Sequence, residues 1–231
     1  MKKIITLTLL VALSLSSIAQ DTTPVNPVKK GDYKILKLDA LNLIGIGIQK
    51  LRLDYEISPM KANQNNLPTV NFNVVVPFNG LNEIDINYGV EGGIELRFYQ
   101  RKRHATNLIA EGFFIGAGLD GGYVNFSRDL TYYNSNTRVY QEQTTEYDRI
   151  RTGIYLVTGG QSQLGDKLYF NLSMGLGWSN VNVTAKESST PTGLNYYSDN
   201  LPLSKLLYNE GKGQRIYAPV SIGIGYNFGT R

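Results

Sequence analysis

The chain offers few side chains that suit catalysis. Its one histidine, His104, ends the basic run 101–104, and histidine is the side chain that most often acts as a general base. The chain has no second histidine and no cysteine, so it lacks the pair of closely spaced ligands that a zinc site requires. A solvated basic turn accounts for the run without any function. We therefore expect no catalytic residue, no metal site and no cofactor, and we expect the protein not to be an enzyme.

Acidic residues form the second group with chemical potential. Glu91, Glu95 and Asp120 can bind a cation or line a pore. Arginines lie in the same or neighbouring segments, and opposite charges inside a narrow barrel pair into a satisfied network. We expect these carboxylates to neutralise three basic side chains, which are Arg52, Arg97 and Arg151.

Two glycine-rich motifs resemble parts of a phosphate-binding loop. They are Gly116-Ala117-Gly118 and Gly175-Leu176-Gly177. A phosphate loop must open a helix, because the helix N-terminus helps to hold the anion. Neither motif precedes a helical pattern, and both fall within segments of strand periodicity. We predict that they are strand glycines of a barrel.

The clearest structural pattern lies at the end of the chain, where residues 215–228 alternate with a period of two. One face is apolar and ends in an aromatic residue: Ala218, Val220, Ile222, Ile224, Tyr226 and Phe228. The other face is mostly small or polar: Tyr217, Pro219, Ser221, Gly223, Gly225 and Asn227. Alternation of this kind is typical of a transmembrane β-barrel strand, with the apolar face toward lipid.

Seven further segments alternate in a similar way, which predicts eight strands in total. The most regular is 167–183, whose apolar face runs from Leu168 to Trp178. The alternation drifts after Ala40 and near Gly121-Gly122, where we predict β-bulges. No helix is expected before residue 199. The predicted strands span 33–43, 48–58, 69–78, 86–99, 108–126, 147–161, 167–183 and 215–228.

The N-terminus has the pattern of a secretory signal. Lys2 and Lys3 precede an apolar run that ends at Leu15, and Ser17-Ile18-Ala19 is a small-x-small cleavage site. The apolar run is shorter than the ~20 residues that a transmembrane helix requires. We predict a signal peptide at 1–19, a flexible leader at 20–32 and a barrel domain at 33–231.

The composition excludes several classes of protein. The formal charge is +4, and removal of the two signal lysines leaves 4 − 2 = +2, which is too small to indicate nucleic-acid binding. The chain contains no cysteine, which excludes disulfides and thiolate chemistry. No apolar run after the signal reaches the length of a membrane-spanning helix, so membrane insertion would require a closed barrel.

Two kinds of eight-stranded barrel share this periodicity. A lipocalin-like barrel directs its apolar face inward around a ligand, whereas an outer-membrane barrel directs it toward lipid. The non-apolar faces of 167–183 and 215–228 carry mainly glycine, serine and asparagine, not the charges of a water-exposed sheet. Charges elsewhere are mixed in sign, and aromatic residues gather toward strand ends, as interfacial girdles require. We predict an all-β fold, an eight-stranded antiparallel up-and-down transmembrane β-barrel.

The two longest connections, 127–146 and 184–214, fall at the same end of such a barrel, opposite the termini. Outer-membrane barrels place longer loops outside the cell and short turns in the periplasm. Residues 199–207 predict a short helix in the second connection. Both connections are rich in tyrosine, which forms either a recognition surface or the outer aromatic girdle and the packed bases of the loops. The tyrosines are Tyr132, Tyr133, Tyr140, Tyr147, Tyr196, Tyr197 and Tyr208.

Four short motifs occur in a characteristic order. They are Leu36-Lys37-Leu38-Asp39, Leu53-Asp54-Tyr55-Glu56, Glu95-Leu96-Arg97-Phe98-Tyr99 and Ile222-Gly223-Ile224-Gly225-Tyr226-Asn227-Phe228. In these motifs the chain resembles the small outer-membrane β-barrel domain family typical of Bacteroidota, of OmpA/OmpX-like eight-stranded architecture. The resemblance covers roughly residues 33–229. It implies insertion by the outer-membrane barrel assembly machinery, which reads the last strand, although Gly229-Thr230-Arg231 here follow the usual terminal aromatic residue.

We therefore expect a non-catalytic protein of the cell outer membrane, secreted through the inner membrane, with a structural or surface-interaction role. Its expected partners are outer-membrane lipid, the assembly machinery during insertion and a protein bound by the extracellular loops. Nucleic acid is not expected. Two alternatives remain open, a narrow channel lined by Glu91, Glu95 and Arg97 and a secreted lipocalin-like binding barrel.

Overall fold

The computed structural model describes residues 34–44, 48–58, 68–79, 84–100, 110–134, 138–165, 167–186, 194–196 and 207–229. The predicted signal peptide and leader, residues 1–19 and 20–32, lie outside these ranges. So do His104 and the basic run that precedes it.

The described residues form ten strands and one short helix. The strands are β1 (Lys34–Asp39), β2 (Gln49–Ile57), β3 (Thr69–Asn79), β4 (Ile84–Tyr99), β5 (Gly112–Asn134), β6 (Val139–Gln163), β7 (Leu168–Ala185), β8 (Leu194–Tyr196), β9 (Gly211–Tyr217) and β10 (Val220–Asn227). The helix is α2 (Ala40–Ile44). No helix in the described part of the chain is long and apolar enough to cross a membrane.

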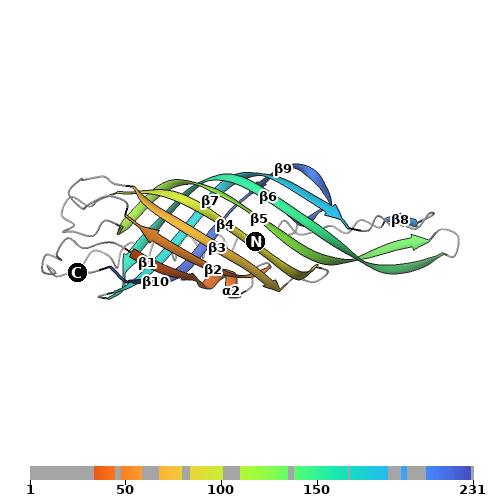
Figure 1. The fold of residues 1–231 in the computed structure, drawn as a ribbon, viewed down its shortest axis with the longest axis horizontal. Helices are drawn as coiled ribbons and strands as arrows, with labels where there is room; N and C mark the ends of the chain where they lie inside the picture. Colours follow the sequence, from red (N-terminus) through yellow and green to blue (C-terminus); the bar gives the residue numbers. More distant parts are fainter. Residues whose placement is uncertain are drawn as a thin grey trace, which may run out of the picture.

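The strands close into an antiparallel barrel (Figure 1). Each strand from β1 to β6 pairs with the next one along the chain. β9 and β10 together make the eighth barrel strand, because both pair with β7, on either side of Ala218 and Pro219. β10 also pairs with β1, which closes the ring, and β8 pairs with β5. The predicted eight-stranded antiparallel barrel is confirmed.

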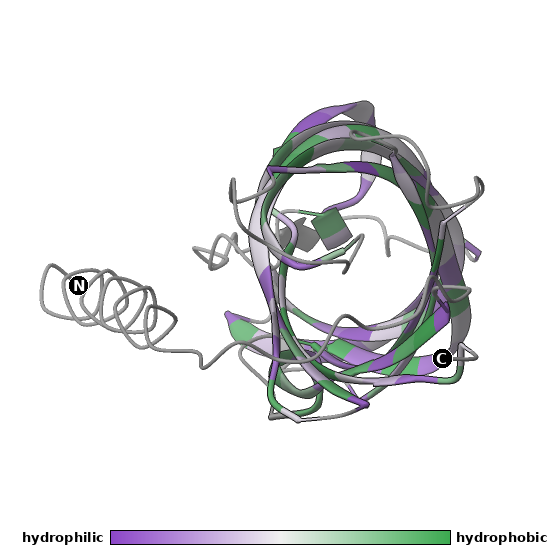
Figure 2. Cartoon of the chain, turned by 90° about the vertical axis from the view of Figure 1, so that its left-hand side faces the viewer, coloured by the Kyte–Doolittle hydropathy of each residue, from purple (hydrophilic) through white to green (hydrophobic). Residues whose placement is uncertain are grey.

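The period-two alternation separates an outer and an inner face on each strand. In β1 the apolar Leu36 and Leu38 are exposed, whereas Lys37 between them is only 3% exposed. Viewed from the end of the barrel where β10 finishes, hydrophilic and hydrophobic residues alternate around the ring (Figure 2). Apolar side chains therefore face outward over much of the wall, and charged side chains face inward.

The first predicted strand, 33–43, is too long, because the chain turns into α2 after Asp39. Asp39 Oδ1 accepts a hydrogen bond from the backbone N–H of Asn42 at 3.1 Å, so Asp39 caps the helix. α2 therefore contradicts the expectation of no helix before residue 199, and it replaces the bulge predicted after Ala40. The other predicted bulge, at Gly121-Gly122, is also wrong. The register shifts instead on β4, between Ile86 and Tyr88.

The predicted loop 127–146 is mostly strand. β5 and β6 pair continuously from Gly112–Gln161 to Asn134–Val139, and this hairpin projects beyond the other strands of the barrel wall, with β8 paired to the outer end of β5 (Figure 1). The second predicted loop, 184–214, contains β8 and the start of β9, and the helix predicted at 199–207 lies outside the described residues except at its end. Both connections leave the barrel at the end opposite the start of β1 and the end of β10, as predicted. We call this end the hairpin end.

Candidate functional site

A balanced set of buried charges occupies the lumen between β1, β2 and β4. We call it the lower network, and each of its side chains is at most 11% exposed. Arg52 donates to both oxygens of Asp54, from Nε at 2.9 Å and from Nη2 at 2.8 Å. The network contains three cations and three carboxylates: Lys37, Arg52 and Arg97 with Asp54, Glu56 and Glu95.

Glu56 and Glu95 join the lower network to neighbouring polar side chains. Glu56 pairs with Lys37 and lies 3.4 Å from Arg97 Nη1, and its Oε1 also accepts from Tyr99 at 2.8 Å. Glu95 accepts from Arg97 Nε at 2.8 Å and from the hydroxyl of Tyr155 at 2.8 Å. No buried nitrogen of the three cations lacks a hydrogen-bond partner. The lower network is therefore saturated, as a structural interior requires.

A second charge cluster, the upper network, lies nearer the hairpin end and contains Lys50, Arg149 and Arg151 with Glu91 and Asp120. The Glu91 carboxylate contacts all three cations. Lys50 Nζ donates to it at 2.9 Å, Arg149 Nη2 also donates, and Arg151 Nε lies 3.5 Å away. Asp120 accepts from Arg151 Nη2 at 2.8 Å. Arg149 is fully buried, yet its Nε and Nη1 have no hydrogen-bond partner. Unlike the lower network, the upper network is not saturated.

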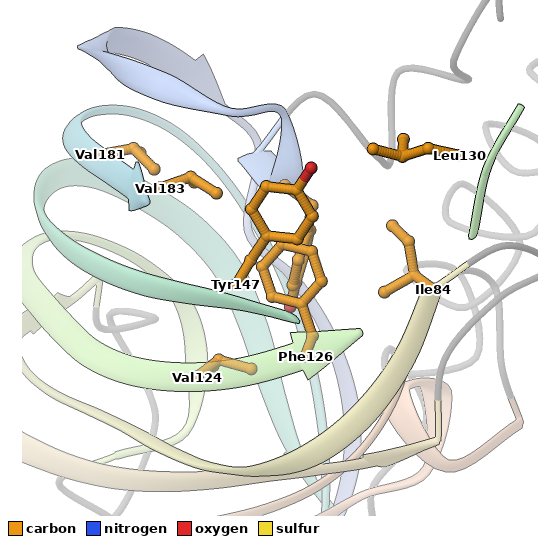
Figure 3. Close-up of a cluster of buried hydrophobic side chains, with 8 residues drawn as sticks. Ile84, Val124, Phe126, Leu130, Tyr147, Val181 and Val183 are labelled. Atoms are coloured by element: carbon orange, nitrogen blue, oxygen red, sulfur yellow. The ribbon is translucent and has the colours of Figure 1, made fainter. Parts of the chain in front are cut away.

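Apolar side chains enclose the charge networks from both ends of the lumen. Arg149 lies over the ring of Tyr208 at 4.3 Å, and Arg97 lies over the ring of Phe114 at 4.6 Å. The upper cluster, at the hairpin end, is Ile84, Val124, Phe126, Leu130, Tyr147, Val181, Val183 and Tyr208 (Figure 3). The lower cluster, at the opposite end, is Ile35, Tyr99, Ala110, Phe114, Tyr155, Val157 and Tyr169.

The polarity of the two faces reverses along β7. From Leu168 to Trp178 the outward side chains are apolar, and the inward ones are small or polar. Beyond Trp178 the outward side chains are polar, whereas the inward Val181 and Val183 are buried and apolar. The exposed polar residues are Asn180, Asn182 and Thr184.

The outward faces of β5 and β6 also change from apolar to polar, at the level where Tyr123 pairs with Ile150. Beyond Ile150 the outward residues of β6 are Asp148 and Glu146. Asn125 Nδ2 donates to Asp148 Oδ1 at 2.7 Å, so this outer surface carries hydrogen-bonded polar groups. The outward faces of three neighbouring strands thus change from apolar to polar together, which places a boundary around this side of the barrel.

Exposed ion pairs occupy the outer surface beyond this boundary. Lys186 pairs with Glu146, and this hydrogen bond is the main reason why the pKa of the Glu146 carboxyl lies below its ordinary value. Thr144 donates to Asp129 at 2.6 Å. A surface with exposed charges of both signs is suited to water.

The predicted loop tyrosines do not form one group. Tyr133 and Tyr140 face each other near the tip of the hairpin, with ring centroids 5.2 Å apart, and Tyr140 is 60% exposed. Tyr147 and Tyr208 are buried in the upper cluster. The other three lie in β5 (Tyr132), in β8 (Tyr196) and outside the described residues (Tyr197).

The remaining predicted site residues lie where expected. Glu95 pairs with Arg52 and Arg97, and Glu91 and Asp120 pair with Arg151, as predicted. Both glycine motifs lie within strands, β5 and β7. Among the described residues no group of three or more His, Asp or Glu side chains is arranged to hold a metal ion.

Sequence reasoning missed Arg149, the most deeply buried cation of the upper network. The alternation carried a signal for it, because Arg149 stands two residues before Arg151 and therefore on the same inward face. Whether the donors of Arg149 find acceptors depends on contacts between distant strands, and the sequence alone does not reveal those contacts.

No match to this chain was found among protein families, curated proteins or solved structures.

Proposed function

We propose that this protein is a non-catalytic β-barrel of the bacterial outer membrane, with the hairpin end outside the cell as a surface for interaction. The change of the outward faces of β5, β6 and β7 from apolar to polar is the observation that carries the proposal. A barrel in water has no reason to expose leucine and tryptophan over one part of its wall and asparagine over the next. A barrel that leaves lipid at that level requires this change.

The width of the apolar part of the wall supports the proposal. Leu168 and Trp178 delimit it on β7 and are ten residues apart. At a rise of ~3.3 Å per residue and a strand tilt of ~40°, ten residues span about 25 Å. The outward apolar band of an outer-membrane barrel has about this height.

The contents of the lumen favour this function over the two alternatives. A lipocalin-like barrel would direct its apolar residues to the interior, but here buried ion pairs occupy the middle of the interior. A channel requires a water-filled path, and both ends of the lumen hold clusters of buried apolar side chains. The filled lumen is typical of a barrel that acts through its outer surfaces.

We further propose membership of the small outer-membrane β-barrel domain family typical of Bacteroidota. The motifs that carry the resemblance occupy barrel strands: β1, β2, β4 and β10. β10 is then the strand that the assembly machinery reads during insertion. A signal peptide at residues 1–19 would direct export through the inner membrane.

The hairpin tip is the proposed contact surface for a partner protein. Val139 is 54% exposed and Tyr140 is 60% exposed, and Tyr133 stacks beside Tyr140. Tyrosine and valine in such a position supply apolar contact area to a partner. The extension of β5 and β6 beyond the other strands holds this tip away from the membrane.

Fractionation of cells and gel mobility test the proposed location. We expect the full chain in the outer-membrane fraction, resistant to carbonate extraction, with a faster-migrating form before boiling that shifts on boiling. A soluble periplasmic protein would contradict the proposal and would direct attention to a lipocalin-like role.

A further inference from the structure

The two charge networks of the lumen differ in balance. The lower network sets three cations against three carboxylates. In the upper network Glu91 and Asp120 face Lys50, Arg149 and Arg151. Among the described residues, these three cations against two carboxylates leave a surplus of one positive charge. The guanidinium of Arg215, which donates to the Asn209 carbonyl at 2.8 Å, also lies close enough to Arg149 for the two charges to repel each other.

The surplus coincides with buried donors that have no acceptor. Arg149 is fully buried, and only its Nη2 donates, to Glu91, while Nε and Nη1 have no partner. The buried hydroxyl of Tyr208, whose ring lies 4.3 Å from the guanidinium, also has no partner. A buried charged donor without an acceptor carries a larger free-energy penalty than a neutral one. An acceptor with negative charge would therefore stabilise this arrangement.

The pairing of strands around the barrel is interrupted next to the upper network. β1 ends at Asp39, and its pairing with β2 reaches only Leu53, so Gln49–Arg52 of β2 has no strand on that side among the described residues. On the other side of the interruption, β9 pairs with β7, and no described strand pairs with its second edge. Lys50, whose side chain is 23% exposed, comes from the part of β2 that lacks this pairing, and Arg215 comes from β9. These two cations therefore flank a break in strand pairing.

We propose that the upper network is a binding site for a phosphate group, which enters beside β9. A phosphate monoester carries a charge of about −1.5 to −2 at neutral pH, which offsets the surplus positive charge of the upper network. Its oxygens accept charge-assisted hydrogen bonds from guanidinium groups, and Arg149 and the partly exposed Lys50 supply a buried and an accessible donor.

The phosphate has two conceivable sources, a membrane lipid and a free phosphate. Tyr217 of β9 pairs with Gly177, next to Trp178, so the break lies at the edge of the apolar band. Lipid headgroups lie at that level of a membrane, and the lipid source therefore rests on the proposed outer-membrane location. Binding of free phosphate does not depend on that location.

Calorimetric titration of the full chain, folded in neutral maltoside micelles, tests the site. The probes are inorganic phosphate, phosphatidic acid and diacylglycerol, the last of which lacks the phosphate. We expect Arg149→Gln and Lys50→Gln to weaken binding by about tenfold or more, as loss of a charged hydrogen-bond donor implies. Lys186→Gln removes a cation from the outer surface near the same end and should leave binding unchanged.

Each outcome decides one question. Binding of phosphatidic acid alone supports the lipid source, and binding of inorganic phosphate as well supports a site for the phosphate group from either source. No binding of either probe, equal binding of diacylglycerol, or undiminished binding by the Lys50→Gln variant would overturn the proposal. Lys50 is partly exposed, so its variant decides the question even where Arg149→Gln does not fold. The outer-membrane location is tested separately by fractionation and would stand if phosphate binding failed.

Discussion

Arg97 of β4 reaches Asn171 of β7, with Nη1 3.3 Å from Oδ1. β5 and β6 separate these two strands along the wall, so the contact crosses the lumen. Tyr217 of β9 likewise donates to Asp120 of β5 at 2.8 Å. Side chains from opposite walls therefore meet in the middle of the barrel and join its two halves.

Because side chains meet across the lumen, we expect the protein to conduct no ions. Planar bilayers that contain the folded protein should show no stepwise single-channel currents. Reproducible currents that change in the Glu95→Gln variant would instead support the channel alternative.

Loss of a charge from the lower network should destabilise the barrel strongly. Glu56→Gln leaves Lys37 and Arg97 without their shared carboxylate, and removal of one partner from a buried ion pair typically destabilises by roughly 3–5 kcal/mol. Urea unfolding in lipid vesicles, followed by tryptophan fluorescence, measures the change. Lys186→Gln, in an exposed pair, serves as the control and should unfold like the parent. Equal stability of the Glu56 variant would show that the lower network is not structural.

A tyrosine packed over a glycine explains one further sensitive position. Gly118 lies directly opposite Tyr155, and a methyl group at Gly118 would overlap the tyrosine ring. We expect Gly118→Ala to displace Tyr155 from Glu95 and to destabilise the barrel by about 1–3 kcal/mol. Gly213→Ala is the matched control, since a methyl group there meets no atom within 4 Å. Similar unfolding curves for both variants would contradict this account of the packing.

Those strands could be predicted from the sequence whose alternation stays regular along most of their length. β7 was expected at 167–183 and spans Leu168–Ala185, because its alternation remains regular on both sides of Trp178. The outer part of the β5–β6 hairpin, residues 127–146, was interpreted as a loop, because beyond Ile150 the outward face becomes polar and the contrast between the faces weakens. Alternation with reversed polarity still specifies a strand.

The interior could be predicted only in part. Inward charges follow from the alternation, so the pairing of Glu95 with Arg97 was expected. The register and curvature of the wall decide which charges meet across it, and these depend on pairing between distant segments. The unpaired donors of Arg149 and the break in strand pairing beside β9 depend on this long-range pairing. They could therefore not be predicted from the sequence.

The tyrosines near the hairpin end should divide into two functional groups. Tyr147 stacks on Phe126 with ring centroids 5.3 Å apart, so Tyr147→Ala should destabilise the barrel by about 2–4 kcal/mol. Tyr140 is 60% exposed, so Tyr140→Ala should change stability far less than Tyr147→Ala but weaken capture of a surface partner. Photo-crosslinking from position 133 on intact cells, with and without the Tyr140 substitution, measures that capture. Identical crosslinked products in both cases would remove the hairpin tip from the proposed contact surface.

Labelling of single cysteines tests the central claim, that the apolar wall lies in lipid and the hairpin end lies outside the cell. The chain has no cysteine, so Leu176→Cys and Asn182→Cys each create a unique thiol, both on the outward face of β7. Intact cells that express either variant are treated with a membrane-impermeant maleimide, and the reaction is repeated after denaturation in detergent. We predict that the cysteine at position 182 reacts in intact cells, whereas the one at position 176 reacts only after denaturation. Equal reaction at both positions in the folded protein would contradict the lipid-facing band.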